Sequence, residues 1–266
     1  MELRERALQV LCIAEPAAKA AAARALALAA RGGLLPDPAL VLAEPDSLPG
    51  RPALPRLVPP HQVPQRSPFT MEGRAALLHA IAHIEFNAIN LALDAVWRFA
   101  GQPVAFYLDW LRVADEEALH FTLLAEHLAT LGHGYGDFDA HDGLWTMAMK
   151  TRDDLLARMA LVPRTLEARG LDATPPIQAK LAKAGDARAV AILDIILRDE
   201  VGHVAIGNRW YGRLCAERAL EPVATYERLA EQYAAPKPRP PFNDAARREA
   251  GFSDDELAWL NQAAIG

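Results

Sequence analysis

The stretch RDEVGHVAIG, residues 198–207, places a glutamate and a histidine three residues apart in an otherwise apolar helical pattern. A second stretch, DEEALH at residues 115–120, repeats this pair as Glu117 and His120. Residues three or four positions apart share one face of a helix, so each pair falls on the stripe that its helix would bury. Ionisable side chains in such stripes need a compensating charge, because burying one alone is costly.

The sequence around these pairs predicts four long helices, in which apolar residues recur with helical spacing. Their expected ranges are 72–100, 104–131, 144–169 and 186–215. Gly132 and Gly170 provide stop signals for the second and third. No segment reads convincingly as a strand. The expected fold is therefore all-α, with a four-helix bundle over residues 69–216.

The segment before the bundle, residues 1–68, differs in composition. It begins with one or two alanine-rich helices that are interrupted near Pro16. The stretch LPGRPALPRLVPPHQVPQRSP follows, and its prolines exclude a helix or a central strand. Leu54, Leu57 and Val58 lie between these prolines as apolar anchors, so we expect an extended arm that lies across the bundle rather than a free linker.

The segment after the bundle, residues 217–266, predicts a C-terminal helical tail packed on the bundle. A short helix over about 217–233 leads into the Pro-rich turn APKPRPPFN. The last helix opens with Ser253 and has Glu256 three residues later. This spacing is typical of a capping box, in which the two side chains satisfy each other's backbone N–H groups.

Composition limits the classes of protein to consider. Of the 266 residues, 52% are hydrophobic and 23% are charged, and no uncharged apolar run is long enough for a membrane span. The first residues lack the apolar core of a secretory signal. Cys12 and Cys215 lie far apart and are expected to be buried reduced thiols, so we expect a cytoplasmic protein. The net charge of −6 disfavours a nucleic-acid partner, including a modified RNA base as substrate.

Each predicted bundle helix carries a glutamate on the stripe that it would bury, and two of these stripes also contain a histidine. The six residues are Glu85, Glu117, His120, Glu167, Glu200 and His203. Four carboxylates that face one another repel, and two histidines cannot neutralise them. No Lys or Arg falls on these stripes. Two divalent or trivalent metal ions would supply the missing positive charge.

The spacing of these residues repeats along the chain. Glu85 precedes Glu117 by 32 residues, and Glu167 precedes Glu200 by 33. The two Glu-x-x-His pairs are 83 residues apart. Two helix pairs of this kind would bring all six side chains to one level of a bundle with pseudo-two-fold symmetry. The alternative is a set of polar core residues that pair with one another.

These residues resemble the ligand set of the ferritin-like di-iron carboxylate superfamily, over about residues 72–215. The flanking stretches GRPALPRLVPPHQVP and KPRPPFNDAARREAGF are similar to an uncharacterised bacterial family of ferritin-like proteins with a domain-of-unknown-function label. The resemblance implies that Glu117 and Glu200 bridge two iron ions, while Glu85 and Glu167 each bind one. It also implies one histidine nitrogen for each ion.

The resemblance extends to residues that would hold the ligands in place. A metal-bound histidine usually donates a hydrogen bond from its second ring nitrogen, which fixes the orientation of the ring. In the superfamily the acidic residue before each bridging glutamate binds the histidine of the opposite helix, which pairs Asp199 with His120 and Glu116 with His203. The alternative is that both are solvated surface acids. Carboxylate and imidazole ligands suit iron, or manganese alone or with iron, better than zinc.

Three other features lie near the predicted ligands. His79 and His83 lie off the Glu85 face and are expected to contact the N-terminal arm or solvent. The loop GHGYGDFDAHDG contains several Asp and His side chains that could bind a second metal ion, but an exposed glycine-rich turn has the same composition. Pro163, one turn before Glu167, predicts either a kink or π-bulge that widens the site, or the start of a new helix.

The leading functional hypothesis is an oxygen-dependent di-iron oxidase or hydroxylase that acts on a small organic substrate. Its electrons would come from a separate donor protein, because the sequence has neither a dinucleotide fingerprint nor a cysteine set for an iron–sulfur cluster. One alternative is a ferroxidase or iron-storage protein. Another is a non-catalytic bundle that metal ions stabilise.

Overall fold

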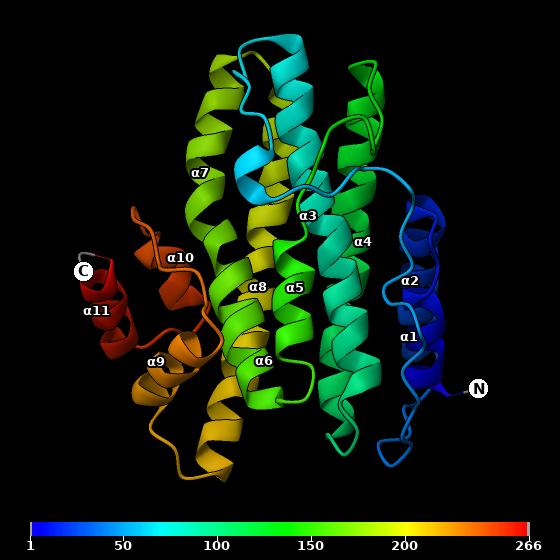
Figure 1. The fold of residues 1–266 in the computed structure, drawn as a ribbon, viewed down its shortest axis with the longest axis vertical. Coiled ribbons are helices and arrows are strands. Elements are labelled where there is room, and N and C mark those ends of the chain that lie inside the picture. The colour runs from blue at the N-terminus through cyan, green and yellow to red at the C-terminus, as the bar shows by residue number, and fades with distance from the viewer. Residues whose placement is uncertain (1, 265–266) are drawn as a thin grey trace. The chain divides into compact units, whose positions relative to one another are not determined.

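The computed structural model describes residues 2–264, and helices account for all the regular elements found there (Figure 1). Within these residues no strand forms, and the sole β-type contact is an isolated parallel bridge between Leu57 and Ala140. The expected all-α fold class is confirmed.

Two compact units make up the chain. The first comprises Met1–Trp145 and Lys180–Ile192, and the second comprises Thr146–Ala179 and Leu193–Gly266. The boundary falls inside three helices, α5, α7 and α8, so each of these helices contributes residues to both units. The division follows spatial contacts, and the segments 1–68, 69–216 and 217–266 stay a prediction from sequence.

The core of the first unit is the pair of helices α3 (Met71–Arg98) and α4 (Val104–Thr130), which lie side by side (Figure 1). The observed bounds fall within two residues of the predicted ranges. Thr70 caps α3, since its hydroxyl accepts the N–H of Gly73 at 3.1 Å. By length and composition α3 could cross a membrane, but 78% of its most apolar window is buried inside the protein, as in a core helix.

Helices α1 (Leu3–Leu11) and α2 (Pro16–Arg31) also belong to the first unit, and the predicted break near Pro16 is confirmed. Lys19 of α2 is fully buried and donates from Nζ to the carbonyl of Gly50 at 2.7 Å and to Asn90 Oδ1 at 2.6 Å. Burial disfavours the charged ammonium and lowers the pKa of Lys19 to about 7.

Arg4 of α1 is completely buried and binds the end of α3. Its guanidinium donates to the carbonyls of Val96 at 3.2 Å and Trp97 at 2.7 Å. It also donates to the carbonyls of Asp37 and Leu40. The last carbonyls of a helix have no partner within the helix, so Arg4 satisfies groups that α3 leaves open.

The Pro-rich segment is an extended chain with one 3₁₀ turn, η1 (Pro60–Gln62). Val58 donates its N–H to the carbonyl of Ala140 at 2.8 Å, and Ala140 donates to the carbonyl of Arg56 at 3.0 Å. Two of the predicted apolar anchors are instead exposed, Leu54 by 59% and Leu57 by 38%. Backbone hydrogen bonds, rather than buried leucines, therefore attach this segment to the loop after α4.

The predicted third helix, 144–169, is wrong as a single element. The structure has α5 (Gly143–Lys150), α6 (Leu155–Leu161), the π-helix η2 (Val162–Glu167) and α7 (Ala168–Lys183). Asp154 starts α6 by accepting the N–H of Ala157 at 3.1 Å. Gly170 lies inside α7 and does not end it. The glycine with a positive φ lies after the end of α7: it is Gly185, with φ at +78°.

The fourth long helix, α8 (Ala187–Glu217), agrees with its predicted range. The C-terminal segment then forms α9 (Pro222–Gln232), α10 (Asp244–Glu249) and α11 (Asp254–Ala263). The predicted capping box of α11 is confirmed: Ser253 Oγ accepts the N–H of Glu256 at 3.2 Å, and Glu256 Oε2 accepts the N–H of Ser253 at 2.8 Å. The six-residue α10 was not predicted.

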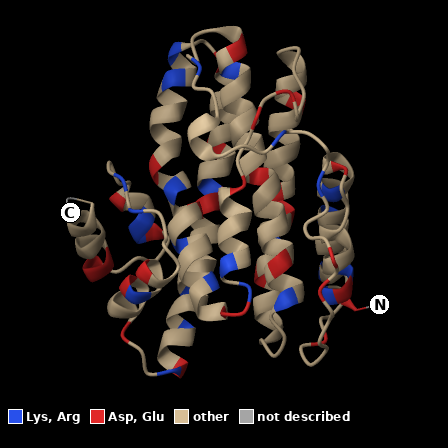
Figure 2. Ribbon diagram, viewed as in Figure 1, with Lys and Arg blue, Asp and Glu red and all other residues tan. Residues whose placement is uncertain are grey.

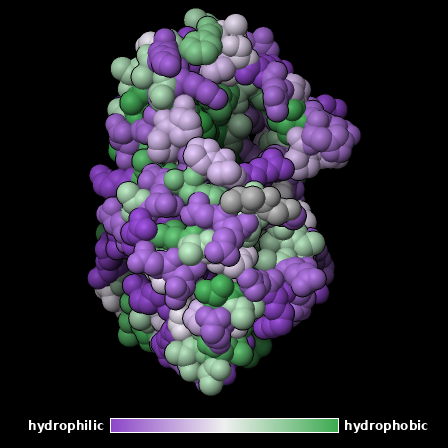
Figure 3. All heavy atoms as spheres, turned by 90° about the vertical axis from the view of Figure 1, so that its left-hand side faces the viewer, coloured by the Kyte–Doolittle hydropathy of each residue, from purple (hydrophilic) through white to green (hydrophobic). Residues whose placement is uncertain are grey.

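Both cysteines are free thiols, Cys215 buried and Cys12 exposed. The expectation of two buried thiols is therefore wrong for Cys12. The face drawn in Figure 3 is a mosaic of hydrophilic and hydrophobic residues.

Candidate metal centre

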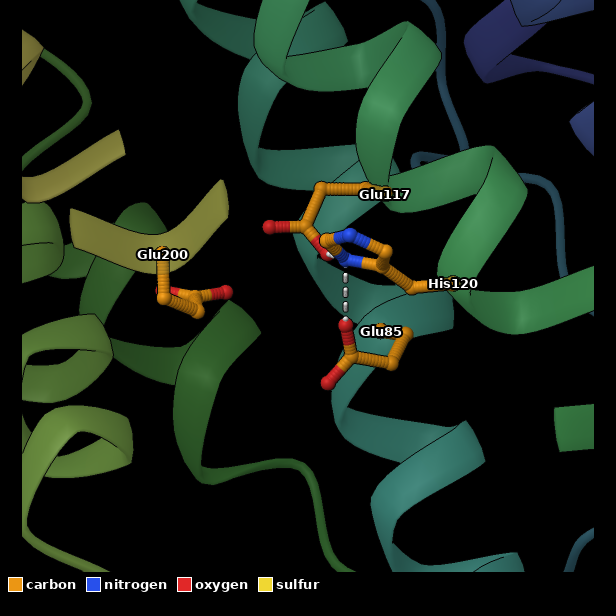
Figure 4. A group of neighbouring side chains, drawn as sticks. All are labelled: Glu85, Glu117, His120 and Glu200. Atoms are coloured by element: carbon orange, nitrogen blue, oxygen red, sulfur yellow. Dashed lines mark hydrogen bonds and ion pairs between the residues drawn. The ribbon is translucent and has the colours of Figure 1, made fainter. Parts of the chain in front are cut away.

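Three of the six predicted ligands come together in the first unit. Glu85 extends from α3, and Glu117 and His120 extend from one face of α4 (Figure 4). One donor atom of each lies within 4.8 Å of the others. Nδ1 of His120 is 3.0 Å from Oε2 of Glu85 and 3.4 Å from Oε2 of Glu117. The exposed fraction of each residue is 3% or less.

Two buried aromatic residues directly follow two of these ligands in the sequence. Phe86 follows Glu85 and Phe121 follows His120, and the two ring centroids are 5.5 Å apart. Both rings are almost completely buried. Charges interact more strongly in such surroundings than in water, and two close carboxylates gain correspondingly from a cation between them.

The second unit holds the other three predicted ligands. Glu200 and His203 are three residues apart on α8, with His203 Nδ1 3.6 Å from Glu200 Oε1. His203 is fully buried and Glu200 is 7% exposed. Glu167 is the last residue of η2 and is partly buried. Glu200, which Figure 4 also labels, and His203 therefore repeat on α8 the local arrangement of Glu117 and His120 on α4.

Of the two alternatives predicted at Pro163, the structure shows π-helical backbone, because the chain stays helical through this position as η2. The predicted widening of the site stays a prediction. A close approach to α8 accompanies the π-helical backbone. A Cβ atom added to Gly207 would lie 2.5 Å from Cβ and 2.6 Å from Cγ of Pro163. Gly207 is one turn beyond His203, so the absence of a side chain there lets η2 pack directly on α8.

The two predicted supporting acids make local ion pairs. Glu116 accepts from Arg112 Nε at 2.9 Å, and Asp199 accepts from Arg198 Nε at 2.8 Å. Their side chains are 23% and 12% exposed, so both are partly buried. Their pairing with His203 and His120 stays a prediction.

His79 and His83 are buried beneath the loop after α4, so the expected exposure to solvent is wrong. His83 Nε2 donates to the carbonyl of His141 at 3.1 Å, which leaves Nδ1 to accept from the Tyr135 hydroxyl at 2.8 Å. His79 Nε2 accepts the N–H of Gly136 at 2.9 Å. The loop folds back onto α3 because the Tyr135 ring stacks on His79, with centroids 5.3 Å apart.

Carboxylates of the same loop pair with the arm. Asp139 binds Arg56, and Asp142 binds Arg51, each at 2.6 Å. The Arg56 hydrogen bond holds the pKa of Asp139 below its usual range. These pairs connect the loop to the Pro-rich segment, and the loop residues do not form a group with metal-ligand geometry among the described part of the chain.

Acid should destabilise the protein through these two histidines. Burial lowers the pKa of His79 and of His83 to about 4, against about 6.5 when unfolded. Between pH 4 and pH 6.5 the unfolded chain therefore binds more protons than the folded chain. The contribution of the two histidines to the free energy of unfolding is complete above pH 6.5 and is lost as the pH falls toward 4. From pH 7 to pH 5 each histidine should cost about 2 kcal/mol, so we expect urea unfolding of metal-free protein to show a loss of roughly 3–4 kcal/mol.

The variant His79→Gln isolates this effect, since it removes one titrating group. Its free energy of unfolding should vary less between pH 7 and pH 5 than that of the wild-type protein. An equal loss in both proteins would assign the acid sensitivity to other groups.

Comparison with known proteins places the chain in a family. The family described as "Protein of unknown function (DUF455)" matches residues 12–258. A Haemophilus influenzae protein described as "Uncharacterized protein" is 55% identical over 222 residues, which cover 81% of this chain and 77% of that protein. No solved structure matches. The chain is therefore a member of the DUF455 family.

Proposed function

We propose that this protein is a ferritin-like, non-haem di-iron oxidoreductase that uses dioxygen. The observation that carries the proposal is the buried group of Glu85, Glu117 and His120, whose donor atoms converge within 4.8 Å. Two buried carboxylates beside one imidazole are costly without a further cation. Oxygen and nitrogen donors of this kind fit iron, with manganese alone or mixed with iron as the alternative.

The proposed centre has six ligands and two ions. Glu167, Glu200 and His203 would complete the set begun by the three residues of the first unit. The repeat of the Glu-x-x-His arrangement on α8 supports this proposal.

The bound ions would supply dioxygen activation. The chain's own groups would bind and orient them. Nδ1 of His120 lies 3.0 Å from Oε2 of Glu85, so this nitrogen would be the ligand atom. The resemblance to the superfamily would pair the second ring nitrogen, Nε2, with Asp199. Phe86 and Phe121 would exclude water, and Glu167 at the end of η2 would provide a further carboxylate.

The proposed substrate class is a small organic molecule, with electrons from a separate donor protein. Lys and Arg are interspersed with Asp and Glu along the helices (Figure 2), which supports the expectation of no nucleic-acid partner. A cytoplasmic location is part of the proposal.

Iron analysis of protein purified without oxygen, followed by stopped-flow absorbance on mixing with dioxygen, tests the function. We expect about two iron ions per chain and a transient visible band. Bound iron without oxygen consumption would support metal ions that only stabilise the fold. A large multimer with many irons per chain would support storage, and little bound metal would remove the six-ligand assignment.

A further inference from the structure

We propose that Arg164 and Glu256 are positioning residues, through which the C-terminal helices hold η2 and thereby set the place of Glu167. This inference rests on the proposed function, because Glu167 matters here as a metal ligand. All the contacts that carry it lie within the second unit. The π-helical backbone is the reason such support is needed, since this form is rare and short when nothing stabilises it.

The first connection runs from η2 to α11 through Arg164. This side chain is 4% exposed and donates from Nε to Asn208 Oδ1 of α8 at 2.6 Å. Its Nη2 donates to Oε1 of Glu256. The guanidinium also lies over the ring of Tyr211, 4.1 Å from the centroid. One residue of η2 thus binds α8 and α11 together.

The second and third connections reach α9 and α10. Thr165 donates to the carbonyl of Ala160 at 3.0 Å, which leaves its oxygen to accept from the Tyr226 hydroxyl of α9 at 2.8 Å. Arg247 of α10 donates to Asp172 Oδ2 of α7 at 2.6 Å and to the carbonyl of Ala168 at 3.3 Å.

The C-terminal segment therefore holds the chain on both sides of Glu167. Residues 164 and 165 are bound before it, and residues 168 and 172 after it. The partners come from three successive helices of the C-terminal segment. A shift of the Glu167 backbone would have to break at least one of these contacts, so the segment fixes where this carboxylate lies.

Glu256 is the acidic partner on which the buried guanidinium of Arg164 depends. A cavity of about 20 Å³ adjoins the guanidinium, with room for roughly one water molecule. Its lining residues are Arg164, Val223, Tyr226, Arg247, Phe252, Glu256, Trp259 and Leu260, among which Glu256 is the only carboxylate. Nη1 of Arg164 is buried without a hydrogen-bond partner among the described residues. No other acid along this cavity can replace Glu256.

The test compares Glu256→Gln with the control Asp255→Asn. Gln still fits the capping box, so α11 keeps its start while Arg164 loses its counter-charge. The control removes one negative charge from the same first turn of α11, next to Glu256 and on an exposed residue. Ferrous iron titration and hydrogen exchange of the metal-free protein, read on a peptide covering residues 162–168, are measured on both.

We expect Glu256→Gln to bind one of the two ions about tenfold more weakly, the size of effect that outer ligand-supporting residues have. The other ion should bind as in the wild-type protein, and residues 162–168 should exchange faster than in Asp255→Asn. Arg164→Lys is the second variant, because a lysine cannot donate to Asn208 and Glu256 in the same fixed geometry. It should show the same selective loss.

Two results separate the possible failures. If the wild-type protein binds two ions, but Glu256→Gln and Arg164→Lys match the control in both affinity and exchange, the positioning role is overturned and the proposed function stands. If the wild-type protein binds no metal, the proposed function fails, and so does the proposal that Arg164 and Glu256 position Glu167 as a metal ligand. The exchange rates would then show only whether the C-terminal segment supports η2.

Discussion

Glu117→Gln should bind far less iron than the wild-type protein, yet its metal-free form should be at least as stable. Glu117 is completely buried and its Oε2 lies 3.4 Å from Nδ1 of His120. Removing a metal ligand should cost more than the 10–100-fold in affinity that outer residues cost. Removing one negative charge from a group of buried carboxylates lowers their repulsion when no cation is present.

Iron content and urea unfolding with and without a chelator measure both effects. Glu126→Gln is the matched control, because Glu126 lies on the exposed side of the same helix. A metal-free Glu117→Gln that is about 3–5 kcal/mol less stable than the wild-type protein would contradict the metal hypothesis. That result would show that Glu117 belongs to a polar network that holds the fold.

Gly207→Ala should destabilise the protein by about 3 kcal/mol, at the upper end of overpacking effects. The added Cβ would lie 2.5 Å from the Pro163 ring. A proline ring cannot rotate away as a flexible side chain does, so the η2 backbone must shift. Because Glu167 ends this element, binding of one ion should weaken in parallel with stability.

Gly212→Ala is the control for Gly207→Ala. Gly212 is also in α8, but nothing lies within 4 Å of the Cβ that the substitution would add. Alanine should there stabilise the helix by up to about 1 kcal/mol through its higher helix propensity. Urea unfolding of both variants measures the difference. Equal stability of the two would show that Pro163 and Gly207 do not pack as closely as described.

The sequence predicted well what helical periodicity encodes. The bounds of α3 and α4, and the convergence of Glu85 with Glu117 and His120, follow from apolar residues that recur on one face of each helix. The capping box at Ser253 was predictable for a related reason, since both partners lie within four residues of each other.

Features that depend on long-range contacts were not predictable. Gly170 has the composition of a stop signal, but a glycine ends a helix only where the backbone turns to positive φ, as at Gly185. His79 and His83 gave no sign of burial, because the loop that covers them is more than 50 residues away. The contact of Arg164 with Glu256 spans 92 residues and leaves no periodic signal.

The buried position of Arg4 has a consequence for how the chain can be divided. Residues near Val41, which is 81% exposed, offer a place where a protease could cut without meeting packed structure. After such a cut Arg4 would still hold the carbonyls of Val96 and Trp97. The first 41 residues and the remainder should therefore stay associated as a two-piece protein, and the two pieces produced separately should reassemble when mixed.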